Sequence, residues 1–379
     1  MLLSFAMLLS GCVNANNSTT VESASTSTDV TAPTQEEALE EDAAPMAALE
    51  EETYQMLLSM NDTALNTLFW YYSDISEDLQ IETEGTYAAD DYYRKVGRFA
   101  TIEEMKAATE QVFTTDFCEA RFYRAFDTAN DYPMYKEIDG QLYRNVQAGG
   151  MGWPWALTDR YELAFADENW RVLGVWLEAW GEYENWSYFV FQSENGIWKF
   201  NHFYDFTPTM SYANMAMPLL DSAVTAYEWN NISELEPYYL TDFYIYQFIA
   251  EPGTEMRYNS PEGYAGGDAA PPYIVPMTEA LDNLATCFDG VTKDMLIDAA
   301  QKQLSMTYNE ATDSLEFLIT FDPGSPLLLN VEKDGDNLIL QSLSIAKSGE
   351  AVRWSYLTAQ EEGEHLHYLS NRVVEIPQE

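Results

Sequence analysis

The sequence predicts an α+β protein of two domains, each made of helices followed by an antiparallel β-sheet meander, behind a lipidated, disordered tether. Twice along the 379-residue chain, apolar residues first recur at helical spacing and then alternate with polar ones. The turn signals Asn195-Gly196 and Asp334-Gly335 each separate two alternating runs, which is typical of β-hairpins. The part beyond the tether, about 325 residues, exceeds what a single core usually supports. A boundary at Thr207-Pro208-Thr209 gives domains 46–207 and 208–379.

The chain begins with an apolar run that ends in Leu9-Ser10-Gly11-Cys12. This is the pattern of a bacterial lipobox, in which a cysteine behind two small residues receives a diacylglycerol thioether and becomes the N-terminus. The run fits the apolar core of a signal peptide, about 7–15 residues, and is too short to span a bilayer. The usual basic n-region is missing, since the first basic residue is Arg94, and we attribute this to a start codon further upstream. We expect residues 1–12 to be a lipoprotein signal peptide ending at the lipidated Cys12.

The next stretch, residues 13–45, is rich in Asn, Ser, Thr, Ala and acidic residues and contains no basic residue. This composition is typical of a disordered tether that holds a domain away from a membrane. We therefore expect the protein at the extracellular face of the cell membrane, attached by its lipid anchor alone.

The charge of the chain restricts its partners. Sixty-three acidic and 18 basic residues give a net charge of −45. A surface this acidic repels nucleic acids and anionic lipid headgroups, so we exclude both as partners. It attracts cationic proteins such as basic enzymes of the cell wall, although solubility alone explains the charge equally well. Cys118 and Cys287 lie in different predicted domains, and we interpret both as buried apolar residues rather than as a disulfide.

The first domain is predicted to begin with helices and to end with sheet. Asn61-Asp62 separates the first two helices, and the capping box Thr101-Ile-Glu-Glu104 opens the third. The expected helices are 36–60, 65–75, one from Thr101 to about Val112, and one capped by Thr115 or Asp116. Asp139-Gly140 is a turn, followed by expected strands at 141–144, 161–165, 171–180, 188–191 and 197–200.

The second domain repeats this order of helices and then sheet. The stretch 251–276 is rich in proline and glycine and is predicted to be a long loop. The expected helices are 211–229, 236–243, 278–287 and 292–304, and the expected strands are 315–321, 327–331, 338–343, 353–357 and 365–369.

Short matches between the halves leave open whether the second domain is a divergent repeat of the first. Asn185-Trp-Ser-Tyr-Phe189 resembles Arg353-Trp-Ser-Tyr-Leu357, and a strand with histidine follows each. Thr115-Asp-Phe117 also recurs, as Thr241-Asp-Phe243.

No catalytic or metal-ligand constellation stands out in the sequence. His365 and His367 fall on one face of a predicted strand, as in some metal sites, but a half-exposed strand face explains them better, and His202 is expected to be structural. The serine-hydrolase, penicillin-binding, phosphate-loop and dinucleotide motifs are missing, and pairs of carboxylates carry no weight among 63 acids. We therefore expect a protein that is not an enzyme and binds no cofactor or metal. An unrecognised wall hydrolase is an alternative.

Seven of the ten tryptophans lie between residues 153 and 198. Most of them fall in predicted strands and are expected in the core: Trp170, Trp176, Trp180, Trp186 and Trp198. Trp153-Pro154-Trp155 differs, because it lies in a Gly-rich loop. An exposed pair there is suited to a protein groove or a sugar ring, whereas a loop folded back on its own sheet is the other interpretation.

The stretch from about residue 88 to 207 resembles a known family in the order and type of its segments. It contains Tyr92-Tyr-Arg-Lys-Val96, Phe99-Ala-Thr-Ile-Glu-Glu-Met105, Val112-Phe-Thr-Thr-Asp-Phe117, Tyr135 to Tyr143, a Gly-rich loop and a hairpin ending in Gly196-Ile-Trp-Lys-Phe200. This pattern is similar to that of the IseA-type inhibitors of cell-wall D,L-endopeptidases, and of IseA-like domains in lipoproteins of Gram-positive bacteria. Members often carry an Arg-Gly pair in the loop, where this chain reads Gly149-Gly150-Met151-Gly152.

The resemblance implies a non-catalytic protein that blocks the active-site groove of a wall peptidase. The leading hypothesis is a lipoprotein that binds and restrains a peptidoglycan D,L-endopeptidase. The expected contact is the stretch 144–155, with Arg144, Gly150 and the anchors Trp153 and Trp155. The alternative is a module that binds wall glycans or peptides without an enzyme partner.

Overall fold

The computed structural model divides into two units, residues 1–45 and 46–379. It describes residues 35–73, 77–82, 92–129, 133–147, 155–179, 183–209, 212, 215–216, 219–220, 223–237, 239–249, 273–302, 306–317, 326–346, 351–363 and 365–376. Cys12 and residues 13–34 of the predicted tether lie outside these residues. Among the described helices, none combines the length and apolar character needed to cross a membrane.

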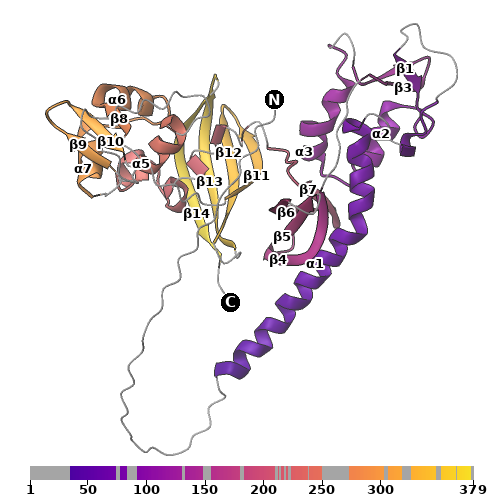
Figure 1. Ribbon diagram of the computed structural model, residues 1–379, viewed down its shortest axis with the longest axis horizontal. Helices are drawn as coiled ribbons and strands as arrows, with labels where there is room; N and C mark the ends of the chain where they lie inside the picture. The colour runs from indigo at the N-terminus through magenta and orange to yellow at the C-terminus, as the bar shows by residue number, and fades with distance from the viewer. Residues whose placement is uncertain are drawn as a thin grey trace, which may run out of the picture. The chain divides into compact units, whose positions relative to one another are not determined.

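Helix α1 runs without interruption from Gln35 to Tyr72 (Figure 1, indigo). The predicted break at Asn61-Asp62 is therefore wrong. Leu57 and Leu68 are fully buried in the core that α1 covers. The Asn61 side chain accepts a hydrogen bond from the Tyr204 hydroxyl at 3.2 Å. Asparagine or aspartate inside a helix costs at most about 0.7 kcal/mol relative to alanine, and burial of the apolar face offsets this.

A small antiparallel sheet follows α1, with its strands in the order β1-β3-β2. The turn between β2 and β3 confirms the prediction at Asp139-Gly140. Both residues have positive φ, 52° and 74°, as a type I′ turn requires. The strands are β1 (Tyr93–Lys95), β2 (Tyr135–Ile138) and β3 (Gln141–Asn145), and the sequence predicts only the last of them.

Two capped helices connect β1 to β2. The Thr101 hydroxyl accepts from the Glu104 N–H at 3.1 Å, and the Glu104 carboxylate accepts from the Ala100 N–H at 2.7 Å, which confirms the helix start. The next helix is capped by Thr114, one residue before the predicted caps, and the Thr114 hydroxyl accepts from the Phe117 N–H at 3.3 Å. The elements are α2 (Ile102–Thr109), α3 (Thr115–Phe117), a π turn (Cys118–Phe122) and a 3₁₀ turn (Tyr123–Phe126).

The first four-stranded sheet is an antiparallel meander in chain order, which we call the first meander. Asn195 and Gly196, with φ of 55° and 77°, form the predicted hairpin turn. Each strand overlaps a predicted one, and Trp180, the predicted end of the second strand, lies outside the described residues. The strands are β4 (Trp155–Ala166), β5 (Trp170–Ala179), β6 (Tyr183–Glu194) and β7 (Ile197–His202).

Both edges of the first meander are bonded to other segments. At β4, the Leu163 N–H donates to the Glu50 carboxylate of α1 at 2.9 Å. At β7, the Phe200 N–H donates to the Val112 carbonyl at 2.9 Å, and the Phe200 carbonyl accepts from the Thr114 N–H at 3.0 Å. Edge groups that a sheet cannot satisfy by itself are thereby partnered.

The second half begins with short helical turns. The predicted helix 211–229 does not reach its expected end, because Trp229 exchanges backbone hydrogen bonds with Asn371 at 2.9 and 2.8 Å. Its indole is also buried. The described elements are 3₁₀ turns at Ala223–Ala226 and Ile232–Glu234, helix α5 (Tyr239–Tyr244) and a π turn at Ile245–Ile249.

A second small sheet follows, in the order β8-β10-β9. Residues 251–272 of the predicted loop lie outside the described residues, and its last four residues form a strand instead. Two predicted helices are confirmed with slightly different ends, whereas β9 is a strand that the sequence does not predict. The elements are β8 (Tyr273–Pro276), α6 (Met277–Ala285), α7 (Lys293–Lys302), β9 (Met306–Asn309) and β10 (Ser314–Phe317).

The second meander closes the chain, and its four strands lie side by side in chain order (Figure 1). Gly335, with φ of 64°, lies in the predicted turn after Asp334. At the β14 edge, the Tyr368 N–H donates to the Cys287 carbonyl at 2.8 Å. The strands are β11 (Leu327–Asp334), β12 (Asn337–Ile345), β13 (Ala351–Glu362) and β14 (His365–Glu375).

The buried side chains that the structure describes gather in three cores. The first core joins α1, the β1–β2 helices and one face of the first meander, and the second core joins α5 to α7 with one face of the second meander. The third core contains residues of both meanders, among them Val172 and Val190 from the first and Leu343 and Trp354 from the second. The α+β class is confirmed, whereas division into domains 46–207 and 208–379 stays a prediction.

Candidate functional site

The predicted contact residues are only partly described by the structure. Gly150 and Trp153 lie outside the described residues. Trp155 is the first residue of β4 and pairs with Ala179 of β5. Its indole is partly exposed and packs against the first core. Trp155 therefore combines a fixed position in the sheet with an accessible ring.

The segment 148–154 connects β3 to β4, and an aromatic residue lies next to each of its ends. Trp155 follows it directly. At the other end, the Val146 N–H donates to the Tyr92 carbonyl at 2.9 Å, and the Tyr92 side chain is 42% exposed. Large aromatic side chains on rigid backbone are suited to contact another molecule, because ordering them costs little entropy.

Arg144 does not belong to this contact. Its side chain is fully buried, and its guanidinium donates to the Ser73 carbonyl at the end of α1. The guanidinium carbon also lies 6.0 Å from the Tyr135 ring centroid. A side chain without exposed surface cannot touch a partner, so the expectation for Arg144 is wrong and its role is to tie β3 to α1. The alternation of side chains along β3 indicates that Arg144 is buried, since Arg144 shares a strand face with the buried Leu142.

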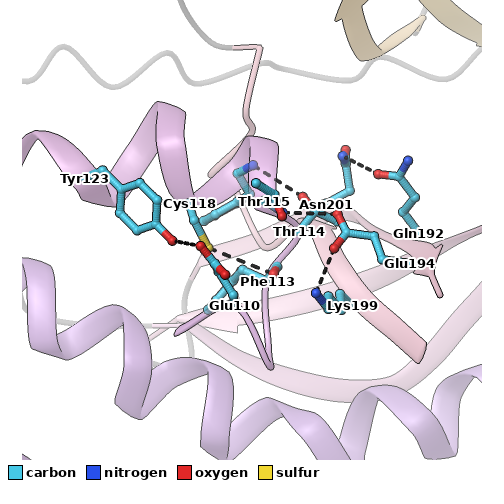
Figure 2. A network of polar contacts seen from close by, with 11 residues as sticks. Glu110, Phe113, Thr114, Thr115, Cys118, Tyr123, Gln192, Glu194, Lys199 and Asn201 are labelled. Carbon is cyan, nitrogen blue, oxygen red and sulfur yellow. Dashed lines mark hydrogen bonds and ion pairs between the residues drawn. The ribbon is translucent and has the colours of Figure 1, made fainter. Parts of the chain in front are cut away.

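A polar network joins the start of α3 to the hairpin of β6 and β7 (Figure 2). The Glu194 carboxylate accepts from the Thr115 N–H at 3.1 Å and from the Lys199 ammonium at 2.7 Å. Beside it, the Asn201 amide donates to the Gln192 side chain at 3.3 Å. Each group has a partner within the protein, so the arrangement fixes the helix on the hairpin.

Cys118 lies at the edge of this network and is buried (Figure 2). Its thiol contacts the Phe113 carbonyl at 3.9 Å. Burial raises the pKa of the Cys118 thiol to about 12, so the thiol stays protonated at neutral pH and is a poor nucleophile. Cys118 and Cys287 are both free and buried, which confirms the prediction for the two cysteines.

His202 is buried at the end of β7 and reaches the second meander. Its Nδ1 lies 2.6 Å from Asn201 Oδ1, and its Nε2 lies 3.1 Å from the Leu328 carbonyl oxygen. The same carbonyl accepts from the Thr209 hydroxyl at 3.0 Å. Burial lowers the pKa of His202 to about 4, so the ring is neutral at physiological pH. His202 therefore holds the two halves together and is not placed to shuttle protons with solvent.

The two histidines of β14 have different surroundings. His365 is exposed, whereas His367 is buried, with Nδ1 3.3 Å from the Thr286 carbonyl oxygen and Nε2 3.6 Å from the Asp289 carboxylate. Within the part of the chain that the structure describes, no group of three His, Cys, Asp or Glu side chains is placed to hold a metal ion.

A second accessible surface lies on the first meander, on the face turned away from the first core. We call it the aromatic strip, and Trp176 and Trp186 lie at its centre, directly opposite each other with ring centroids 6.0 Å apart. Both are partly exposed, so the prediction that they serve the core is wrong for them and holds for the buried Trp170. The strip consists of Arg160, Glu162, Gly174, Trp176, Trp186 and Tyr188.

Comparison with known proteins finds no family model, no curated protein and no solved structure that matches this chain. The relation to the IseA-type family therefore stays a prediction that rests on the segments quoted above.

Proposed function

We propose that the protein is a non-catalytic lipoprotein, anchored through Cys12 at the outer face of the cell membrane, that binds and restrains a peptidoglycan D,L-endopeptidase. The observation that carries the proposal is the pair of accessible aromatic residues, Tyr92 and Trp155, at the two ends of the segment 148–154. In this proposal Trp153 and Trp155 are the anchors of the contact, which also includes Gly150. Few residues usually carry most of the energy of an interface, and tryptophan is prominent among them.

The electrostatic character of the chain supports a protein partner of opposite charge. A net charge of −45 attracts a basic wall enzyme and raises the rate of association. The Debye length is about 8 Å at physiological ionic strength, so this attraction weakens with added salt. We therefore expect the association rate to fall as the salt concentration rises.

The surroundings of Cys118 and His202 support a role in binding rather than in thiol chemistry. The thiol is protonated at neutral pH and the imidazole is enclosed by protein groups on both nitrogens. In this proposal inhibition results from occupation of the active-site groove, and no bond of the partner is broken.

The test is a binding and inhibition assay with the full chain carrying Cys12→Ser, which prevents acylation. We expect a one-to-one complex with a purified D,L-endopeptidase in size-exclusion chromatography, together with loss of peptidase activity on peptidoglycan. Trp153→Ala and Trp155→Ala are each expected to weaken binding by about 2 kcal/mol, roughly thirtyfold, the size of a hot-spot effect. Trp198→Ala on β7, at the opposite edge of the sheet from β4, is the matched control.

The absence of a complex with every D,L-endopeptidase tried, at micromolar concentrations and low salt, would overturn the proposal. Equal binding by the Trp155→Ala, Trp153→Ala and wild-type chains would overturn the assignment of the contact.

A further inference from the structure

The aromatic strip is built by three neighbouring strands of the first meander. β5 and β6 contribute Trp176 and Trp186, which pair directly across the two strands. A second row crosses all three strands, with Glu162 opposite Gly174 and Gly174 opposite Tyr188. The side chains of both rows lie on the face opposite the first core, since the residues next to them, Val175 and Phe189, belong to that core.

An irregularity in β4 places a charge on one tryptophan of the strip. The pairing of β4 with β5 shifts between Leu157 and Tyr161, and Arg160 lies within this bulge. Its guanidinium carbon lies 4.4 Å from the Trp176 ring centroid, while the residue itself remains exposed. Bulges commonly redirect a side chain next to a functional site. Here the bulge presents guanidinium donors beside an aromatic ring.

Gly174 determines where the second tryptophan of the strip lies. A Cβ atom at residue 174 would stand 2.4 Å from Cζ2 and 2.7 Å from Nε1 of Trp186, closer than real Cβ contacts. Only glycine therefore leaves room for the indole in this position. Glycine weakens a strand interior and often marks a place where another group approaches closely. Gly174 therefore lowers the stability of β5 locally, and in return it leaves room for Trp186 to lie against the sheet.

We infer that the aromatic strip is a binding surface for a neutral, N-acetylated glycan. The C–H faces of a sugar ring pack on aromatic rings, and its hydroxyl and acetamido groups need hydrogen-bond partners beside those rings. Arg160 supplies donors and Glu162 supplies acceptors next to the two indoles. The exposed Glu178 follows Trp176 on the same face of β5, so carboxylates outnumber Arg160 at the strip. This and the net charge of −45 disfavour polyanionic ligands such as nucleic acid. The charged groups beside the rings also make the surface a poor fit for an apolar helix.

The strip is independent of the endopeptidase contact proposed above. Tyr188 packs against the third core, so the strip begins where the contact between the two meanders ends. A glycan bound there would hold the protein at the wall without occupying the segment 148–154.

The test uses the full chain with Cys12→Ser and two probes. Isothermal titration with the soluble chitin pentasaccharide, β-1,4-linked N-acetylglucosamine, measures binding to a glycan without peptides. Co-sedimentation with peptidoglycan stripped of anionic polymers measures binding to the wall. We expect both to bind. Trp176→Leu and Trp186→Leu keep an apolar side chain but remove the ring, and each is expected to weaken binding at least tenfold.

Two further variants separate the surface from general stability. Gly174→Ala retains both rings but displaces Trp186, and it is expected to weaken binding several-fold. Trp198→Leu, a partly exposed tryptophan of the same sheet that packs on the first core instead, is expected to leave glycan binding unchanged. Circular dichroism establishes that each variant is folded.

Failure of the folded wild-type chain to bind the pentasaccharide overturns the inference, even where it sediments with peptidoglycan, because the ligand is then the peptide. Glycan binding that survives both leucine variants overturns the assignment to the strip. Inhibition of a D,L-endopeptidase by Trp186→Leu is expected to equal that of wild type, so the two proposals succeed or fail separately.

Discussion

Trp186-Ser187-Tyr188 and Trp354-Ser355-Tyr356 occupy the same place in the two halves, the third strand of each meander. In both, the following residue, Phe189 or Leu357, points into the core below the sheet. The tryptophans nevertheless differ in their surroundings. Trp354 is 8% exposed and meets Phe165 of the first meander edge to face, with ring centroids 5.3 Å apart. Trp186 lies over Gly174 and stays partly exposed.

The difference shows how one motif serves two purposes. The residue opposite Tyr188 is Gly174, whereas the residue opposite Tyr356 is Gln341. In the first half the glycine gives the indole a place on its own sheet. In the second half the indole is used to cover the other sheet. Burial of Trp354 holds the halves together, while the accessible Trp186 is available to a ligand.

The comparison extends beyond the meanders. The small sheets have the equivalent orders β1-β3-β2 and β8-β10-β9, and in each half two helices lie between the first and second strands. A residue just after the first of these helices, Phe113 or Cys287, lies next to the edge strand β7 or β14. This agreement supports the proposal that the second half is a divergent repeat of the first.

The match between Thr115-Asp-Phe117 and Thr241-Asp-Phe243 does not fit that repeat. The first segment forms α3, after β1, whereas the second lies in α5, before β8. The structural counterpart of the Thr114 cap is Thr292, whose hydroxyl accepts from the Met295 N–H at 3.3 Å before α7.

Replacing the two equivalent tryptophans provides the strongest test of the comparison. Trp354→Ala is expected to lower the free energy of unfolding by about 3–5 kcal/mol, because it empties a buried site in the third core. Trp186→Ala is expected to cost about 1 kcal/mol, since its ring is partly exposed. Urea denaturation of the two variants measures both values. Equal losses would show that the two tryptophans do not differ in their structural role.

His202 tests the contact between the halves through pH. Its pKa is about 4 in the folded protein against 6.5 unfolded, so the folded state binds fewer protons between these values. The contribution of His202 to the free energy of unfolding is complete above pH 6.5 and is lost as the pH falls towards 4. The total loss is about 3 kcal/mol. Urea denaturation at pH 7.0 and pH 5.0 measures the loss.

His202→Gln is the variant that isolates this effect. It retains polar atoms able to reach the Leu328 carbonyl but does not titrate, so the difference between pH 7.0 and 5.0 should shrink relative to wild type. An unchanged pH dependence would mean that other groups cause it.

The helix starts of the two halves differ in capping, and a smaller effect is expected there. α2 is capped by the Thr101 side chain, whereas the N-cap residue of α6 is Pro276, which provides no side-chain cap. Thr101→Ala is expected to lower the free energy of unfolding by about 1 kcal/mol. Glu104→Gln keeps an acceptor for the Ala100 N–H and is expected to change stability by less than about 0.5 kcal/mol. A loss as large as that of Thr101→Ala would show that the negative charge of Glu104, and not its hydrogen bond, stabilises the helix start.

The two cysteines are expected to behave alike and to show the smallest effect. Burial raises the pKa of both thiols, so neither Cys118 nor Cys287 should react with iodoacetamide at pH 8 in the native state. Both should be modified after unfolding in urea, and mass spectrometry detects each product. Rapid native alkylation of one thiol only would reveal a difference in local opening between the halves.

The fold class, both meanders and the hairpin turns are predictable from the sequence because they depend on local patterns. Alternation identifies the strands, and Asn195-Gly196 and Asp139-Gly140 provide residues that tolerate positive φ. The capping box at Thr101 is equally local. Short strands were not predictable: β1 and β9 have three and four residues and exist through their partners in the sheet.

Tertiary contacts explain the remaining differences. Asn61 stays helical because the Tyr204 hydroxyl and a buried helix face hold it there, and Trp229 leaves the expected helix to pair with β14. At the candidate sites, the sequence leaves open whether Trp155 is exposed or folded back on its own sheet, and the structure shows it in β4, partly exposed and packed on the first core. The sequence also does not reveal that Trp186 is partly exposed, because exposure depends on which face the third core covers. The interior Gly174 was the available signal for that surface.

The hydrogen bonds at the edge strands of the meanders affect how copies of the protein can associate. A main-chain group of each outer strand is hydrogen-bonded to a segment outside its sheet. These pairs are Leu163 with α1, Phe200 with the turn after α2, Tyr368 with Cys287, and Leu328 with His202. Copies of the lipoprotein proposed above would meet at high local concentration, where open edge strands join into intermolecular sheets. These bonds occupy edge groups that such intermolecular sheets would need.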